Sequence, residues 1–117
     1  MQLVRVRNHT RGEVLAERAE LASSHWTRFW GLMGRRDLAP GTGLVLQPGG
    51  GIHMCFMRIS LDVVHVDKHR RVTHILRNIK PWRFGPLFVG GKWAIELPVG
   101  AASRTQVGDE IELEPST

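Results

Sequence analysis

The stretch IHMCFMRISLD, which begins at residue 52, holds the side chains most capable of chemistry in this 117-residue chain. On a β-strand, His53, Cys55 and Met57 project from one face, because side chains alternate. Imidazole, thiolate and thioether are ligands that copper favours, but a complete site needs further ligands, and only His65 and His74 stand as single candidates on neighbouring segments. Met and free Cys also fill gaps in hydrophobic cores. We therefore expect core packing here, with no metal and no cofactor.

Nucleophilic catalysis at Cys55 would require a nearby base and an electropositive setting. His53 shares its face, but no motif marks an oxyanion hole. The glycine runs GTG and PGGG lack the Lys and the Ser or Thr of a phosphate loop. The sequence therefore predicts an inert thiol and no nucleotide-binding loop.

Two carboxylates, Asp62 and Glu96, stand within strongly apolar segments. A buried carboxylate needs a cationic or hydrogen-bonding partner, and Arg58 and Arg83 are the obvious candidates. We expect a paired structural role, because structural ion pairs also perturb carboxylates. The alternative is a hydrolase that uses Asp62 and Glu96 as a carboxylate pair, which would require the two groups to lie about 5–10 Å apart beside an open cleft.

The motif KPWR places Trp82 between two cations, Lys80 and Arg83. Such an arrangement resembles an aromatic platform with anion-binding arms. The alternative is a tryptophan tucked under the rim of a barrel, with solvated neighbours.

These residues form one predicted site, at a rim of the sheet, for a small polar or anionic ligand. The competing hypothesis is a closed structural ion-pair network without a pocket. The predicted ligand-binding residues are Arg58, Asp62, Lys80, Trp82, Arg83 and Glu96.

Short strands must position this site. In KWAIEL, Trp93, Ile95 and Leu97 face one way, and Lys92, Ala94 and Glu96 face the other. Many short strands separated by Gly- and Pro-rich turns predict a mainly β protein: one compact antiparallel β-sandwich or barrel-like domain over residues 1–117. The predicted strands are LVRVR, VLAERAEL, LVLQ, IHMCFM, LDVVHVD, VTHILRNI, KWAIEL and EIELE.

One short amphipathic helix is also expected. Ser24 is a suitable N-cap, and Trp26, Phe29, Trp30 and Met33 recur at the spacing of a single helical face. The glycine that follows Met33 suits a left-handed C-cap. This apolar stripe predicts a helix packed against the sheet.

The composition limits the possible partners. The net charge is +5, and the chain has one cysteine. A single cysteine suits a reducing compartment, and no apolar run approaches membrane-spanning length, so we expect a cytoplasmic protein that does not enter a membrane. The basic charge leaves weak, non-specific nucleic-acid binding as a third alternative, but predicts no specific nucleic-acid partner.

An ordered set of motifs resembles the domain-of-unknown-function 192 family over Leu21 to Leu113. The motifs are GLMGRRDL, GLVL, IHMCFMRISLDVVHVD, IKPWR, AIELPVG and VGDEIEL. The resemblance implies a compact β-rich fold with short helices, and no activity is established for that family. The recurrent residues that it matches here are Arg58, Asp62, Lys80, Arg83 and Glu96, together with the apolar Met57, Trp82 and Pro98.

Departures from the family pattern fall at Met54 and Cys55, where aromatic or small residues are usual. The hairpin also carries His69–Arg70 where Asp-Gly is common, which implies a different turn. Many relatives resemble secreted or membrane-anchored proteins, whereas this chain begins without an apolar leader, so the expected location stays cytoplasmic.

Overall fold

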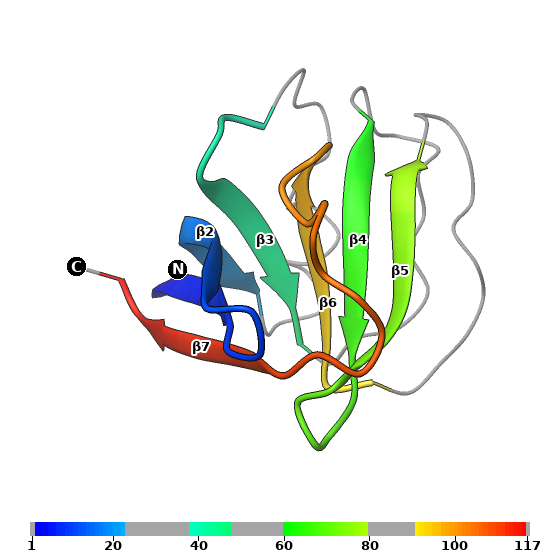
Figure 1. Cartoon of the computed structure of the whole chain (residues 1–117). Coiled ribbons are helices and arrows are strands. Elements are labelled where there is room, and N and C mark those ends of the chain that lie inside the picture. Colours follow the sequence, from blue (N-terminus) through cyan, green and yellow to red (C-terminus); the bar gives the residue numbers. More distant parts are fainter. Residues whose placement is uncertain (1, 23–37, 48–59, 80–90, 117) are drawn as a thin grey trace.

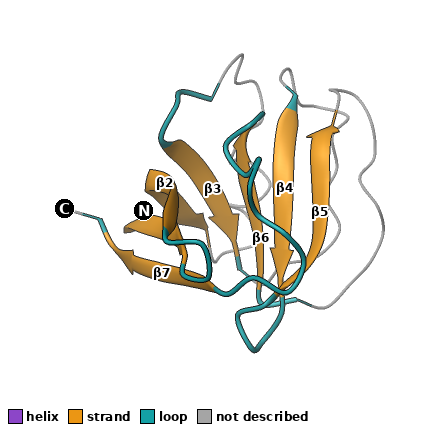
Figure 2. Cartoon of the chain, viewed as in Figure 1, coloured by secondary structure: helices purple, strands orange, loops and turns teal. Residues whose placement is uncertain are grey.

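The computed structural model describes residues 2–22, 38–47, 60–79 and 91–116, and these residues contain seven strands and no helix (Figures 1 and 2). The predicted helix after Ser24 and the predicted strand IHMCFM lie outside the described residues. The other predicted strands are all present. They are β1 (Gln2–Asn8), β2 (Glu13–Ala22), β3 (Thr42–Leu46), β4 (Leu61–Val66), β5 (Val72–Ile79), β6 (Trp93–Pro98) and β7 (Ile111–Pro115).

The strands form a single sheet in the order β5-β4-β6-β3-β2-β1-β7. All neighbouring pairs are antiparallel except β2 and β3, which run parallel with Arg18 opposite Thr42 and Ala22 opposite Leu46. The sequence predicted an antiparallel sheet, and the β2–β3 pair differs from this prediction because it is parallel. A parallel pair requires a crossover connection, which the tight-turn pattern of the sequence did not indicate.

The sheet curls until its two outermost strands meet at one end (Figure 1). Backbone hydrogen bonds join Val72 N to Asp109 O at 2.8 Å and Ile111 N to Arg70 O at 2.8 Å. An isolated bridge pairs Arg71 with Glu110. The result is a half-barrel, which confirms the barrel-like, mainly β prediction.

Each face of the central strands carries its own hydrophobic cluster. The inner cluster includes Trp93, Ile95 and Leu97, and the outer cluster includes Ala94. The alternation predicted for KWAIEL is therefore confirmed. Because both faces are covered, β4 and β6 are apolar throughout, except at a few polar positions. The other outer-cluster residues are Leu44, Leu46, Leu61 and Val63.

The turn of the β4–β5 hairpin contains no glycine. Arg70 N donates to Asp67 O at 3.0 Å, and Arg70 itself adopts a φ of 65°. The Asp67 carboxylate accepts hydrogen bonds from His69 N and Arg71 N at 2.8 and 3.0 Å. A tight turn followed by a left-handed residue is a common three-residue hairpin. The expected departure from an Asp-Gly turn therefore places the positive φ on an arginine.

Candidate functional site

Asp62 is a buried structural anchor. Its side chain is 2% exposed, and its two oxygens accept hydrogen bonds from Asn78 N at 2.8 Å and Gly100 N at 2.9 Å. Both donors belong to residues with positive φ, 53° for Asn78 and 94° for Gly100. Backbone amides thus provide the partners that we expected from arginines. Asp62 connects the end of β5 to the turn that follows β6.

Glu96 is buried in a different environment. It is 5% exposed, and its cross-strand neighbours Leu44 and Val63 are aliphatic members of the outer cluster. Burial raises the pKa of the Glu96 carboxyl to about 7, because it disfavours the charged form.

The two carboxylates point to opposite faces of the sheet. Asp62 pairs with Leu97, whose side chain belongs to the inner cluster, whereas Glu96 pairs with Val63 of the outer cluster. Paired residues on neighbouring strands share a face. The structure therefore does not bring Asp62 and Glu96 together, and the predicted convergence is corrected for these two residues. The other predicted site residues, Arg58, Lys80, Trp82 and Arg83, lie outside the described residues.

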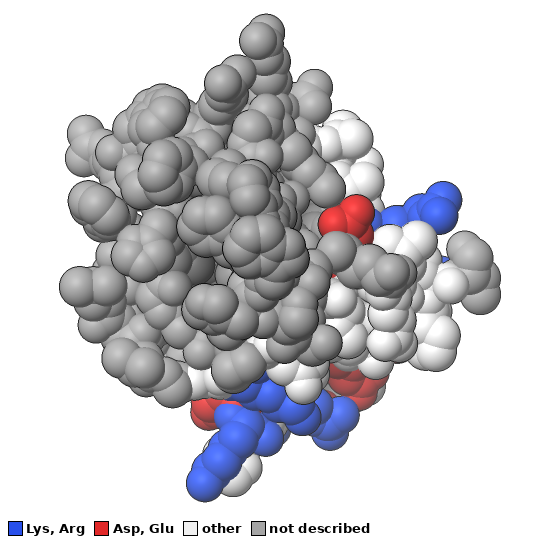
Figure 3. Space-filling view, turned by 180° about the vertical axis from the view of Figure 1, so that it is seen from behind, with Lys and Arg blue, Asp and Glu red and all other residues white. Residues whose placement is uncertain are grey.

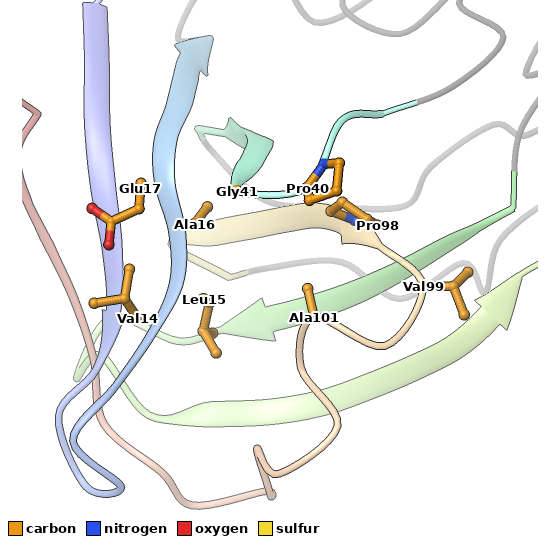
Figure 4. Close-up of a pocket in the computed structure, with 9 residues that line it drawn as sticks. All are labelled: Val14, Leu15, Ala16, Glu17, Pro40, Gly41, Pro98, Val99 and Ala101. Atoms are coloured by element: carbon orange, nitrogen blue, oxygen red, sulfur yellow. The ribbon is translucent and has the colours of Figure 1, made fainter.

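A pocket of about 340 Å³ opens at the inner side of the half-barrel (Figure 4). It is formed by part of β2, by the turn before β3 and by the turn after β6. Figure 4 shows Leu15 and Ala16 on the side of β2 toward Ala101, whereas Glu17 lies toward β1. The lining residues are Val14, Leu15, Ala16, Glu17, Pro40, Gly41, Pro98, Val99 and Ala101.

Irregular pairing of β2 shapes one wall of this pocket. Arg7 is opposite Val14 and Val6 is opposite Ala16, so Leu15 is an extra residue in the ladder. Such a bulge bends a strand and redirects its side chains, and bulges are frequent beside binding sites. Because of it, the consecutive residues Leu15 and Ala16 both belong to the inner cluster.

Backbone hydrogen bonds hold the remaining walls. Thr42 N donates to Ala39 O at 3.1 Å, and Arg18 N donates to Gly41 O at 3.0 Å. In the turn after β6, Ala101 N donates to Pro98 O at 3.0 Å, and Asp62 accepts from Gly100 N. The pocket is therefore built on fixed turns. Asp62, predicted as a ligand-binding residue, lies behind one of its walls.

Among the described lining residues the only charged side chain, that of Glu17, is engaged elsewhere. Its Oε2 lies 3.0 Å from Arg5 Nε on β1. The remaining lining side chains are apolar or glycine. The described lining therefore offers shape and apolar contact, with its one carboxylate held by Arg5.

A polar cluster that the sequence did not indicate lies where the segment between β6 and β7 ends, around Asp109. Asn8 Nδ2 donates to Asp109 Oδ2 at 2.9 Å, and Arg11 Nε and Gln106 N donate to the same oxygen at 2.8 and 2.9 Å. Burial acts to raise the pKa of Asp109, but these hydrogen bonds outweigh it and hold the pKa below its usual range. Asn8 and Asp109 are far apart in the chain, so no local pattern connects them.

The architecture is that of a small β-rich half-barrel with one apolar pocket described between its strands and turns. A family model identifies the family of the chain: residues 6–113 match the DUF192 family, described as "Uncharacterized ACR". The chain therefore belongs to this family, as its motifs indicated. No helix among the described residues is long and apolar enough to cross a membrane.

Individual relatives agree with this assignment. A UPF0127 protein of Thermococcus sibiricus is 36% identical, over 92% of this chain and 73% of its own length. A UPF0127 protein of Pyrococcus furiosus is 31% identical, over 90% of this chain and 94% of its own length. A crystal structure of a protein of unknown function from Novosphingobium aromaticivorans matches with a TM-score of 0.78 and 29% identity, covering 94% of this chain and 83% of the other.

Proposed function

We propose that this protein is a non-catalytic module that binds a small ligand, and that the pocket between β2 and the turns around Gly41 and Val99 receives the ligand's apolar part. The observation that carries this proposal is the pocket itself, at about 340 Å³. Small-molecule sites are typically concave, mostly apolar and about 300–1,000 Å³ in volume. The bulge in β2 and the turn held by Asp62 form this shape before any ligand arrives.

The polar or anionic group of the ligand would remain at the pocket mouth. Arg18 is exposed on β2, and its backbone amide bonds to Gly41 of the pocket wall. We propose that its side chain is one of the cations that meet this group. Arg58, Lys80, Trp82 and Arg83 remain proposed contributors to binding this group, and a cytoplasmic location remains part of the same proposal.

A hydrolytic function has less support than binding. A carboxylate pair requires two groups that flank one bond, and Asp62 and Glu96 face opposite sides of the sheet. Asp62 also uses both oxygens to hold backbone amides. Neither residue is therefore placed to act with the other on a substrate.

Chemical-shift mapping of the protein against a library of small polar and anionic metabolites tests the proposal. We expect amphiphilic members to shift the amide signals of Leu15, Ala16, Gly41 and Ala101. The variant Val99→Glu should weaken binding by about tenfold, roughly 1.4 kcal/mol, because it places a charge at the apolar mouth. Val99 is 51% exposed, so this variant should fold.

The matched control is Val107→Glu, at a valine that is 65% exposed and does not line the pocket. It should bind like the unaltered protein. Shifts that cluster away from the pocket, or equal weakening in both variants, would contradict the proposed site.

A further inference from the structure

In the described part of the chain, the first half of strand β2 pairs with a neighbouring strand on one side only. β2 pairs with β1 from Glu13 onward, whereas its parallel ladder with β3 begins at Arg18. The chain before β3 makes a turn, in which Thr42 N donates to Ala39 O at 3.1 Å. Among the described strands, none therefore lies beside residues 13–17 on the side away from β1. This stretch, the open edge of β2, lies within the sheet rather than at either end of it.

The pocket lies along this open edge. It is lined by four consecutive residues of β2, from Val14 to Glu17. Because side chains of a strand alternate between faces, a cavity over one face would be lined by every second residue. The bulge accounts for Leu15 and Ala16 together, but contact with all four residues places the pocket against the strand's edge. Figure 4 shows Pro40 and Pro98 across the pocket from β2. An open edge offers backbone N–H and C=O groups to an added strand.

The length of this edge limits what it can bind. Glu17 O accepts a hydrogen bond from Ser116 Oγ at 3.0 Å, so a new ladder would use residues 13–16. At about 3.3 Å per residue, these span about 10 Å, which matches roughly three residues of an extended peptide. The bulge at Leu15 interrupts regular pairing and also disfavours a longer strand.

The charges at this edge favour an anionic partner. Glu17, the one carboxylate among the described lining residues, pairs with Arg5 at 3.0 Å. The next residue, Arg18, is exposed, and the net charge of the chain is +5. A positive field attracts anionic ligands. The apolar lining, the backbone edge and the positive charge together match one kind of molecule, a short peptide that ends in an aliphatic residue and a free carboxylate.

We propose that the ligand of this pocket is the C-terminal segment of a peptide, about three residues long, that adds to the open edge of β2 as a strand. Its last side chain enters the pocket, and its carboxylate pairs with Arg18. Because Arg18 follows residues 13–17, the peptide runs parallel to β2, as β3 does. This inference rests on the proposed function, since it names the chemical class of the ligand for the same pocket. Main-chain hydrogen bonds supply affinity, and the pocket and the carboxylate contact supply specificity.

NMR titration of the full chain with the peptide acetyl-Ala-Ala-Leu, which has a free carboxylate, tests the inference. We expect the amide signals of Leu15, Ala16 and Gly41 to shift. The same peptide with a C-terminal amide should bind about tenfold more weakly, because it loses a charge-assisted hydrogen bond. Acetyl-Ala-Ala-Gly should also bind at least about tenfold more weakly, because no apolar side chain enters the pocket. Methylation of a backbone nitrogen in the peptide should weaken binding, because it removes a ladder donor.

Protein variants test the carboxylate contact separately. Arg18→Gln should weaken binding of the free-acid peptide by about tenfold and leave binding of the amide peptide unchanged. Because Arg18 is exposed, this variant should fold, which circular dichroism verifies. The matched control is Lys68→Gln, which removes one positive charge at an exposed residue of the β4–β5 hairpin. It should bind both peptides like the unaltered protein.

The outcomes separate this inference from the proposed function. If metabolites shift the pocket signals and acetyl-Ala-Ala-Leu does not, the peptide inference is overturned and the proposed function stands. If neither the metabolites nor the peptide shifts them, both are overturned. Equal affinity for the peptides methylated at any backbone nitrogen would rule out addition as a strand. Equal effects of Arg18→Gln on the acid and amide peptides would rule out the carboxylate contact.

Discussion

At the scale of single residues, the burial of Glu96 makes the stability of the fold depend on pH. This side chain is a carboxyl beside the aliphatic residues of the outer cluster, with its pKa raised to about 7. In the unfolded chain the carboxyl would ionise near its ordinary value of 4.5. Folding therefore becomes less favourable as the pH rises between these two values, because the unfolded state releases the proton first.

Replacing Glu96 by Gln should remove this pH dependence. Glu96 contributes its full stability below about pH 4.5, and this is lost as the pH rises through 7. We expect Glu96→Gln to match the unaltered protein near pH 4.5 and to be more stable at pH 8 by roughly 2–3 kcal/mol. Urea unfolding at both pH values measures the difference.

The control for this comparison is Glu17→Gln, at a side chain that is 59% exposed. It should change stability little at either pH. A Glu96→Gln difference that is the same at pH 4.5 and pH 8 would show that Glu96 keeps an ordinary pKa in the folded protein.

At the scale of elements, the segment between β6 and β7 closes the half-barrel. Arg77 of β5 donates to Ala102 O and Thr105 O, both at 2.8 Å, and Asp62 of β4 holds Gly100 N. Ala102 is fully buried in the inner cluster. This irregular segment is thus anchored from two strands, and its first turn forms part of the pocket.

The anchoring by Asp62 can be measured. In Asp62→Asn, one acceptor oxygen becomes an NH₂ group that faces a backbone donor. We expect destabilisation of about 1–3 kcal/mol, because a buried amide loses its partner. Urea unfolding gives the value, and faster hydrogen exchange at Gly100 or Asn78 locates it.

Asp67→Asn is the control, because Asp67 also accepts two backbone hydrogen bonds, but both at Oδ1 and in an exposed turn. Its loss should be smaller, since the amide oxygen of asparagine can still accept both bonds. Equal losses in the two variants would indicate that the use of both Asp62 oxygens as acceptors is not what stabilises the fold.

The edge strand β7 contains residues that disfavour pairing with a strand of another chain. Among the described strands it pairs only with β1. Its sequence IELEP contributes Glu112, Glu114 and a terminal Pro115. Charges and proline on an edge strand discourage the addition of a further strand. This edge is therefore less suited to capturing an extended peptide than its length suggests.

At the scale of the whole molecule, positive charge gathers at the hairpin end. Lys68, Arg70 and Arg71 are exposed in the β4–β5 hairpin, and Lys92 N bonds to Val66 O beside it. Figure 3 shows basic side chains at the lower end of the molecule, where Figure 1 places this hairpin. Glu110 approaches both Arg70 and Arg71 at 3.6 Å and offsets part of the charge.

This distribution predicts weak, non-specific nucleic-acid binding. Exposed Lys and Arg side chains bind DNA through its phosphates, and phosphate contacts carry no sequence information. Affinity for a mixed-sequence DNA duplex, measured by fluorescence polarisation, should fall steeply between 50 and 200 mM salt. Lys68→Glu should weaken it further, whereas Arg18→Glu, away from the hairpin, should have less effect. Sequence-selective binding at physiological salt would refute the prediction.

The elements themselves followed from the sequence, because a strand's side-chain pattern is local. KWAIEL and EIELE alternate with a period of two, and this alternation correctly assigned Trp93, Ile95 and Leu97 to one face and Glu96 to the other. The ordered motifs also identified the family. These inferences need only neighbouring residues, and backbone geometry sets the period.

The tertiary structure alone decided which residues meet. Asp62 binds amides 16 and 38 residues away, and the pocket draws on three separate segments of the chain. His65 meets His74 only because the register of β4 and β5 aligns them, and Asp62 and Glu96 separate because adjacent positions in paired strands face opposite sides. Register and strand order depend on how distant segments pack together, so the site could not be read from local patterns.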